Sequence, residues 1–422
     1  MISCDSPALA KGLVPLEDAR AVLAQRALQY GVMTATETLP LHSLLNRVLA
    51  ENIISDINVP GFDNSAMDGY ALCLVDCQQQ VTDSGTINMS VSQRIAAGDA
   101  PALLLENTCA RIFTGAAVPE NADIVVMQEQ CEITDDGQIT FPANVADAKP
   151  QQNIRPAGQD IAIGQNLFQP GRILRAEDLG VLASMGFSEV EVYQRLKVAV
   201  ISSGDELVEP GKPLSSGKIY NTNSFTLIGL LQRMGMEVVG PFFAPDTLAD
   251  TQEILTQASA AADVIITSGG VSVGEEDHIK AAISSGGELE MWRLAIKPGK
   301  PFALGQFNNV PVIGLPGNPA AVVVTFYQLA RDFLWILQGA DAQPLLNLKG
   351  IATFSTKKSI GRTEFLRARF NQGEIEIFNN QSSGVLSSSS WSDGFACVPA
   401  GKMISEGDEI DFYALTTAHG HG

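Results

Sequence analysis

The chain has 422 residues and a formal net charge of -20, with 45% hydrophobic and 18% charged residues. This composition is typical of a folded globular protein and excludes a disordered chain, and the length favours about three domains. The acidic balance argues against a general nucleic-acid binder, which would carry a basic face. An anionic substrate would therefore need a local cluster of positive charge.

Features of the sequence also indicate the compartment. The six cysteines are scattered and the four histidines show no zinc spacing, so reduced thiols are expected. Residues Met1–Asp5 lack the basic and apolar segments of a signal peptide. The longest apolar segment, Ala320–Leu337, contains Gln328, Arg331 and Asp332, which disfavour a membrane span. We expect a cytoplasmic protein without membrane association.

The first part of the chain reads as a helical region interrupted by a β-rich insertion. Apolar spacing predicts helices over Pro15–Leu28, Leu41–Ala50 and Ala176–Met185. Residues 58–148 are instead rich in Val, Thr, Gly and Pro and show few helical periods. We therefore predict a discontinuous N-terminal region, residues 1–57 and 149–194, around an inserted β domain.

Residues 195–343 alternate between apolar bursts and helical segments. Strands are predicted at 198–202, 237–240, 264–266 and 310–314, and helices at 222–234, 247–261, after 277, and from 319 to about 337. Such alternation is typical of a doubly wound parallel sheet. After Pro344 the pattern becomes all β, which predicts a small antiparallel sheet or barrel over 344–415 and a disordered tail over 416–422. The fold class is thus multidomain α/β.

Four predicted strands end in turns that carry polar residues. The turns contain Asp205 and Glu206, Asp246, the run Ser268-Gly269-Gly270 followed by Asp277, and the sequence Leu315–Pro319. Because carboxyl ends of parallel strands share one edge of a sheet, these residues should converge. Backbone N–H groups in such turns bind anions and carboxylates bind cations, although each acid alone could simply cap a helix.

A positively charged cluster follows the glycine run. Arg293, Lys297 and Lys300 lie within eight residues, and Pro298 and Pro301 stiffen the backbone between them. Guanidinium and ammonium groups suit tetrahedral oxyanions, so we interpret this cluster as an anion site rather than an exposed loop of ordinary surface lysines.

Two motifs in the insertion are less specific. Residues Pro60–Tyr70 are dense in turn formers and carry Asp63 and Asp68. The segment Arg111–Gly115 ends a predicted strand at a hydroxyl group and a glycine. Each of these motifs could be purely structural.

Together the motifs resemble the MoeA and gephyrin E-domain family, the molybdopterin molybdenumtransferases. The likeness is carried by Pro60–Tyr70, Thr267–Glu275, Ile296–Pro301 and Leu315–Pro319, in this order along the chain. The resemblance implies an elongated homodimer of four regions that inserts molybdate into adenylylated molybdopterin, with Mg²⁺, and releases AMP. It also implies transient contacts with the adenylyltransferase that supplies the substrate and with acceptor molybdoenzymes.

The resemblance further assigns residue roles. Glu206, Asp246 and Asp277 would bind the metal and, with Asp68, serve catalysis. The family commonly has lysine where Arg293 stands, which keeps the charge but changes the donor geometry. The positions that would bind substrate are Thr114, Asp160, Ser268, Gly269, Gly270, Arg293, Lys297, Lys300, Pro316, Pro319, Arg362 and Ser383.

Two other functions remain open at this point. The chain could itself adenylylate molybdopterin, since that enzyme shares the α/β domain, or it could be a non-catalytic scaffold of the same fold. A nicotinamide dehydrogenase is disfavoured, because no predicted strand is followed by Gly-x-Gly-x-x-Gly with an acid about twenty residues on.

Overall fold

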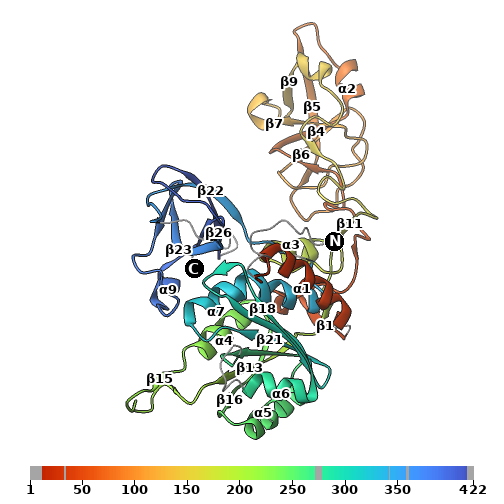
Figure 1. Cartoon of the computed structure of the whole chain (residues 1–422). Helices are drawn as coiled ribbons and strands as arrows, with labels where there is room; N and C mark the ends of the chain where they lie inside the picture. Colours follow the sequence, from red (N-terminus) through yellow and green to blue (C-terminus); the bar gives the residue numbers. More distant parts are fainter. Residues whose placement is uncertain (1–11, 33–34, 271–277, 342, 358–360, 416–422) are drawn as a thin grey trace.

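A computed structural model describes residues 12–32, 35–270, 278–341, 343–357 and 361–415. The molecule is elongated, and the inserted β domain projects away from the other three regions (Figure 1). The N-terminal region lies at the base of this projection, on top of the α/β domain, and the C-terminal domain lies beside both.

The N-terminal region contains less helix than its sequence predicts. Helix α1 (Leu16–Tyr30) and helix α3 (Ala176–Ser184) are present, and strand β1 (Thr36–Pro40) pairs antiparallel with β12 (Glu189–Tyr193). The predicted helix over residues 41–50 is wrong: only a 3₁₀ turn, η2 (Leu41–Ser43), forms there. Asn46 adopts a left-handed φ of 61°, which ends helical backbone, and Val48 and Leu49 make β-bridges instead.

The inserted β domain stands on a short two-stranded stalk. Strand β2 (Ile53–Ile54) pairs with β11 (Asn166–Phe168), and β3 (Asn64–Ser65) pairs with β10 (Ile154–Arg155). Beyond the stalk lies a six-stranded sheet, and helix α2 (Leu74–Gln79) contributes Leu74 and Cys77 to the apolar cluster on one face of it. The order of the sheet is β7 (Ile124–Met127), β4 (Gly69–Leu72), β6 (Thr108–Ile112), β5 (Thr86–Ile95), β9 (Ile139–Pro142) and β8 (Glu132–Ile133).

The doubly wound sheet of the α/β domain is confirmed. Its parallel strands are, in order, β16 (Glu237–Ala244), β13 (Lys197–Ser203), β17 (Val264–Ser268) and β21 (Val310–Leu315). Two antiparallel strands that we did not predict, β20 (Pro301–Phe307) and β18 (Gly287–Arg293), extend the edge. Asn308 and Asn309, with φ of 49° and 64°, form the tight turn that reverses the chain between β20 and β21.

Helices cover both faces of this sheet. Residues of β13 alternate between two apolar clusters. Val198 and Val200 face α1, α4 (Asn223–Arg233) and the helical segment Pro319–Leu337, which comprises α7 (Pro319–Thr325), the π-turn η5 (Phe326–Ala330) and α8 (Arg331–Leu337). Ala199 and Ile201 face α5 (Leu248–Ala261) and α6 (His278–Gly286).

The segment Pro319–Leu337 is long and apolar enough to cross a membrane by composition. However, 89% of the window that meets this criterion is buried inside the protein, as expected of a core helix. Among the described residues it is the one helix of this kind.

The C-terminal domain is a small closed barrel, as predicted. Its strands are β22 (Asn347–Ala352), β23 (Thr363–Asn371), β24 (Glu374–Ile377), β25 (Gly394–Val398) and β26 (Glu409–Ala414). Strand β23 pairs with both β24 and β25, which closes the barrel. In addition, the short strand β19 (Ile296–Lys297) of the α/β domain pairs in parallel with β23 and joins the two domains through their main chains.

Candidate functional site

A cavity of about 910 Å³ opens at the carboxyl ends of β13, β17 and β21, and the C-terminal domain forms its other wall. Polar loops meet there because parallel strands end at the same edge of the sheet. Eleven positions to which the sequence assigned a role line this cavity: Glu206, Asp246, Ser268, Gly269, Gly270, Lys297, Lys300, Pro316, Pro319, Arg362 and Ser383.

On the acidic side of the cavity, the Asp246 carboxylate is held by hydrogen bonds and the Glu206 carboxylate is not. Asp246 accepts hydrogen bonds from the Ser203 hydroxyl at 3.1 Å and the Asp205 amide at 3.0 Å, while its own amide donates to Asp205 at 3.3 Å. The Glu206 side chain lies over Gly204, where a Cβ would come within 2.4 Å of it. In the part of the chain that the structure describes, no donor reaches the Glu206 carboxylate. Asp205 therefore holds Asp246 in place, and the Glu206 carboxylate is available to a ligand.

Two acids at the cavity carry donor atoms of the kind that bind metal ions. No group of three His, Cys, Asp or Glu side chains among the described residues is close enough to hold a metal ion. Glu206 and Asp246 both line the cavity, and their hard oxygen atoms suit Mg²⁺. Asp277, the third predicted ligand, lies outside the described residues.

The glycine run brings main chain into the cavity wall. Gly269 has φ of 89°, and a Cβ at this position would lie 2.9 Å from the Ser203 carbonyl oxygen, so only glycine fits. The side-chain amide of Asn223 donates to the Ser268 hydroxyl and to the Gly317 carbonyl, each at 2.7 Å. Asn223 thus ties two loops of the cavity together.

The basic wall is built from two domains. Lys297 and Lys300 come from the loop around β19, and Arg362 comes from the start of β23. The ammonium of Lys297 donates to Glu364 at 2.6 Å, and the Arg362 guanidinium donates to the Ile296 carbonyl at 3.3 Å. Three positively charged side chains therefore line the cavity. Two of them, Lys297 and Lys300, belong to the charge cluster that we interpreted from the sequence as an anion site.

Arg293 lies apart from this wall. It is exposed at the last position of β18, opposite Pro301, and is not among the residues that line the cavity. Its carbonyl oxygen accepts a hydrogen bond from the Val14 amide. The main chain of Arg293 runs close to that of Lys300, since the Leu294 amide donates to the Lys300 carbonyl at 2.7 Å, but the Arg293 side chain does not line the cavity.

A buried arginine that we did not predict supports the C-terminal side of the cavity. Arg367 is completely buried; its guanidinium donates to the Ser388 hydroxyl at 3.0 Å and to the Ser382 carbonyl at 3.1 Å. Burial lowers the pKa of Arg367 to about 10. Because Ser382 and Ser383 line the cavity, this side chain holds the loop that presents Ser383.

The predicted residues of the inserted domain do not line the cavity of their own chain. The amide and hydroxyl of Thr114 donate to one oxygen of Asp68 at 2.8 and 2.9 Å, and these hydrogen bonds lower the pKa of that carboxyl. The amide of Asp160 donates to the Val59 carbonyl at 3.0 Å. All three residues are exposed; Asp68 and Thr114 belong to the inserted domain, and Asp160 lies between the stalk strands β10 and β11.

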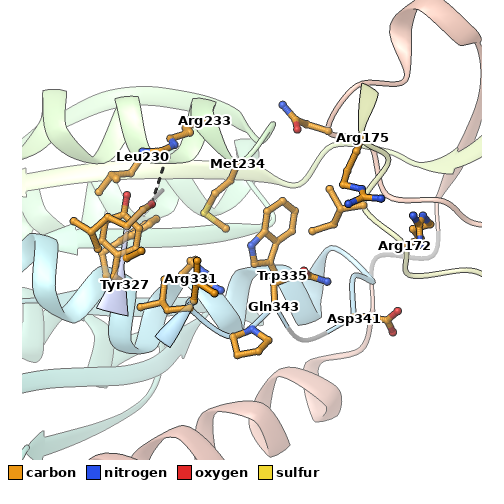
Figure 2. A pocket seen from close by; sticks show the side chains of 18 of the residues that line it. Arg172, Arg175, Leu230, Arg233, Met234, Tyr327, Arg331, Trp335, Asp341 and Gln343 are labelled. Carbon is orange, nitrogen blue, oxygen red and sulfur yellow. Dashed lines mark hydrogen bonds between the residues drawn. The ribbon is translucent and has the colours of Figure 1, made fainter. Parts of the chain in front are cut away.

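A second cavity, of about 630 Å³, lies where the N-terminal region, the α/β domain and the C-terminal domain meet (Figure 2). Its arginines contact protein groups, although the buried Nε of Arg331 has no hydrogen-bond partner among the described residues. Arg172 donates to Asp178 at 2.7 and 3.0 Å, Arg233 donates to the Leu415 carbonyl at 3.3 Å, and Arg331 forms an ion pair with the neighbouring Asp332 at 3.2 Å. None of the predicted site residues lines this cavity, and we interpret it as a joint between domains.

Comparison with known proteins agrees with this architecture. Three family profiles match: "MoeA N-terminal region (domain I and II)" over residues 14–186, "Probable molybdopterin binding domain" over 199–335, and "MoeA C-terminal region (domain IV)" over 349–415. The chain is 44% identical to a molybdopterin molybdenumtransferase of Haemophilus influenzae over 86% of its length and 89% of that protein. The chain belongs to the MoeA family.

Other MoeA-family proteins show the same extent of likeness. Molybdopterin molybdenumtransferase 2 of Mycobacterium tuberculosis is 33% identical over 90% of this chain and 95% of its own. A crystal structure of the molybdopterin biosynthesis MoeA protein from Pyrococcus horikoshii superposes with a TM-score of 0.81, at 28% identity, over 95% of this chain and all of that one. The likeness thus spans all four regions of the fold.

Proposed function

We propose that this chain inserts molybdate into adenylylated molybdopterin and releases AMP. The observation that carries the proposal is the single cavity in which two carboxylates and three positively charged side chains, contributed by two domains, face one another. Such a cavity suits a substrate that combines a pyrophosphate with a second oxyanion. The names of the relatives, molybdopterin molybdenumtransferases, support the same reaction.

The basic wall is the proposed oxyanion site. Lys297, Lys300 and Arg362 would hold molybdate and phosphate oxygen atoms, and Ser383 would donate a hydrogen bond from the C-terminal domain. The main chain at Ser268–Gly270, together with Pro316 and Pro319, would shape the pocket for the pterin pyrophosphate. Much of the catalysis is then positioning of molybdate against the dithiolene sulfur atoms.

The acidic side is the proposed Mg²⁺ site. Glu206, Asp246 and Asp277 would hold the ion, which when bound would neutralise the pyrophosphate and polarise the phosphorus. Asp246 is already fixed by Ser203 and Asp205, so its carboxylate needs no rearrangement to accept a cation. Cleavage of the phosphoanhydride, with water supplying the oxygen, would release AMP.

We further propose that a homodimer completes the site. Asp68 and Thr114 lie on the inserted domain and Asp160 lies between the stalk strands β10 and β11, and none of them lines the cavity in its own chain. The fixed and ionised Asp68 is suited to contact substrate across a subunit boundary, from the second copy of the chain. A cytoplasmic location and transient contacts with the adenylyltransferase and with acceptor molybdoenzymes remain predictions from the sequence.

The test is incubation of the protein with adenylylated molybdopterin, molybdate and Mg²⁺. We expect AMP to appear, and chelation of Mg²⁺ to stop its release. Release of pyrophosphate from ATP and molybdopterin would instead identify an adenylyltransferase, and no turnover of either substrate would indicate a scaffold. Glu206→Ala should abolish AMP release, whereas Glu209→Ala, an exposed acid on the same segment outside the cavity lining, should not.

A further inference from the structure

The lysine at the centre of the basic wall is held by an acid from another domain. The Lys297 ammonium lies 2.6 Å from a carboxylate oxygen of Glu364. The Lys297 side chain is 46% exposed and lines the cavity, whereas the Glu364 side chain is 9% exposed and is not among the residues that line it. The lysine is thus in contact with a buried anion on one side and with the cavity on the other.

Main-chain pairing fixes the two partners opposite each other. In the parallel pair of β19 and β23, Ile296 is in register with Thr363 and Lys297 with Glu364. The Thr363 amide also donates to the Ala295 carbonyl at 3.0 Å. Opposed side chains on neighbouring strands interact directly, so the C-terminal domain determines where the lysine ammonium points.

This arrangement bears on anion binding. A half-exposed lysine has a flexible stem, and ordering that stem upon binding costs free energy. A lysine that is already held pays less of this cost when a ligand arrives. The Glu364 carboxylate also adds negative charge near the cavity, which opposes anion binding, so its orienting effect and its charge must be separated by experiment.

We propose that Glu364 is a positioning residue for the oxyanion site. Its carboxylate orients the Lys297 ammonium toward the cavity, so the C-terminal domain contributes to molybdate binding through a lysine of the α/β domain, in addition to Arg362 and Ser383. This inference rests on the proposed insertion of molybdate.

The experiment compares Glu364→Ala with Glu364→Gln. Alanine removes the acceptor that orients Lys297, whereas glutamine keeps an acceptor oxygen and removes the charge. We expect Glu364→Ala to raise the KM for molybdate about tenfold, with kcat and the KM for adenylylated molybdopterin within about twofold of wild type. Glu364→Gln should stay within about threefold of wild type in all three parameters.

The barrel offers a matched control. Lys349 and Asp411 are also directly opposed on paired strands, at 2.7 Å, but line no part of the cavity. Asp411→Ala should leave the KM for molybdate unchanged. Thermal unfolding of each variant checks that the barrel is intact. If Glu364→Ala does not fold, Glu364→Asp replaces it: the shorter side chain withdraws the acceptor from Lys297, so the KM for molybdate should rise, and a wild-type KM would refute the role.

The results separate this inference from the proposed function. An unchanged or lowered KM for molybdate in Glu364→Ala, or equal KM values in the alanine and glutamine variants, would overturn the positioning role. If wild-type protein releases no AMP, the proposed function fails, and calorimetric titration with molybdate alone still compares the variants: about tenfold weaker binding in Glu364→Ala supports the role and equal binding refutes it.

Discussion

Replacing Asp246 with asparagine tests whether the negative charge of Asp246, rather than the hydrogen bonds that hold its loop, is needed for activity. The carboxylate accepts two hydrogen bonds, from the Ser203 hydroxyl and the Asp205 amide. An asparagine keeps the shape and one acceptor oxygen, but its NH₂ group cannot accept the second hydrogen bond. The change therefore removes the negative charge and one hydrogen bond, and leaves the backbone of both loops in place.

The structural cost of this substitution is modest. A hydrogen bond to a charged group contributes about 1.5–3 kcal/mol, and Asp246 is only partly buried, so the free energy of unfolding should fall by about 2 kcal/mol. The catalytic cost should be larger. We expect AMP release to fall at least about 100-fold, equivalent to about 2.7 kcal/mol in the barrier, because a proposed ligand of Mg²⁺ loses its charge.

The assay is AMP release as a function of Mg²⁺ concentration, beside thermal unfolding. Ser203→Ala is the matched control, because it removes the hydrogen bond from the Ser203 hydroxyl and leaves the carboxylate in place. We expect it to reduce AMP release by less than about fivefold, the effect of roughly 1 kcal/mol. If Asp246→Asn turns over within threefold of wild type and requires no more Mg²⁺, or if Ser203→Ala is equally impaired, the assignment of Asp246 to the metal is wrong.

Two further predictions concern stability and loop geometry. Burial raises the pKa of Asp178, but hydrogen bonds and charges from Arg172 and Arg175 outweigh this effect and lower it; the resulting stability is present above the unfolded pKa of about 3.9 and is lost as pH falls below it. Asp178→Asn should therefore reduce the free energy of unfolding at pH 7 by about 2 kcal/mol and lower the melting temperature accordingly. Both effects should become smaller toward pH 3, and an equal loss of unfolding free energy at pH 7 and pH 3 would contradict this reasoning. Gly299 has φ of 99° and its Cβ would lie 2.4 Å from the Thr325 side chain, so Gly299→Ala should displace Lys297 and raise the KM for molybdate severalfold, whereas a wild-type KM would show that the loop tolerates the strain.

The sequence was most informative where function depends on local pattern. The strand bursts before Ser203 and Ser268 and the glycines after them predicted both the α/β sheet and the edge at which the cavity opens. The helix over residues 41–50 was mispredicted because apolar spacing cannot reveal the left-handed backbone of Asn46. The antiparallel strands β18 and β20 were missed because their pairing depends on the connection between them, residues 294–300, and not on a pattern within either strand.

The supporting residues of the site could not be found from the sequence. Glu364 is 67 residues from Lys297 and meets it only through the register of β19 and β23. Arg367 occurs in an alternating strand pattern in which a charged residue is expected to be exposed, yet it is completely buried. Contacts of this kind join segments that only the folded structure brings together, between domains for Glu364 and within the barrel for Arg367, and no local pattern encodes them.

The stalk of the inserted domain has a consequence for how the chain can be built and altered. The chain leaves through β2 and β3 and returns through β10 and β11, and the paired strands hold the outgoing and incoming segments side by side. The domain beyond them has its own buried clusters on both faces of its sheet. The two ends of the inserted domain therefore lie next to each other. A short turn that replaces the whole domain would reconnect the chain without disturbing the cavity of the α/β domain. Such a shortened protein keeps Glu206 and the cavity but lacks Asp68, whereas a full-length partner without Glu206 keeps Asp68. In a mixed dimer of the two, each half of the proposed site would lie on a different polypeptide.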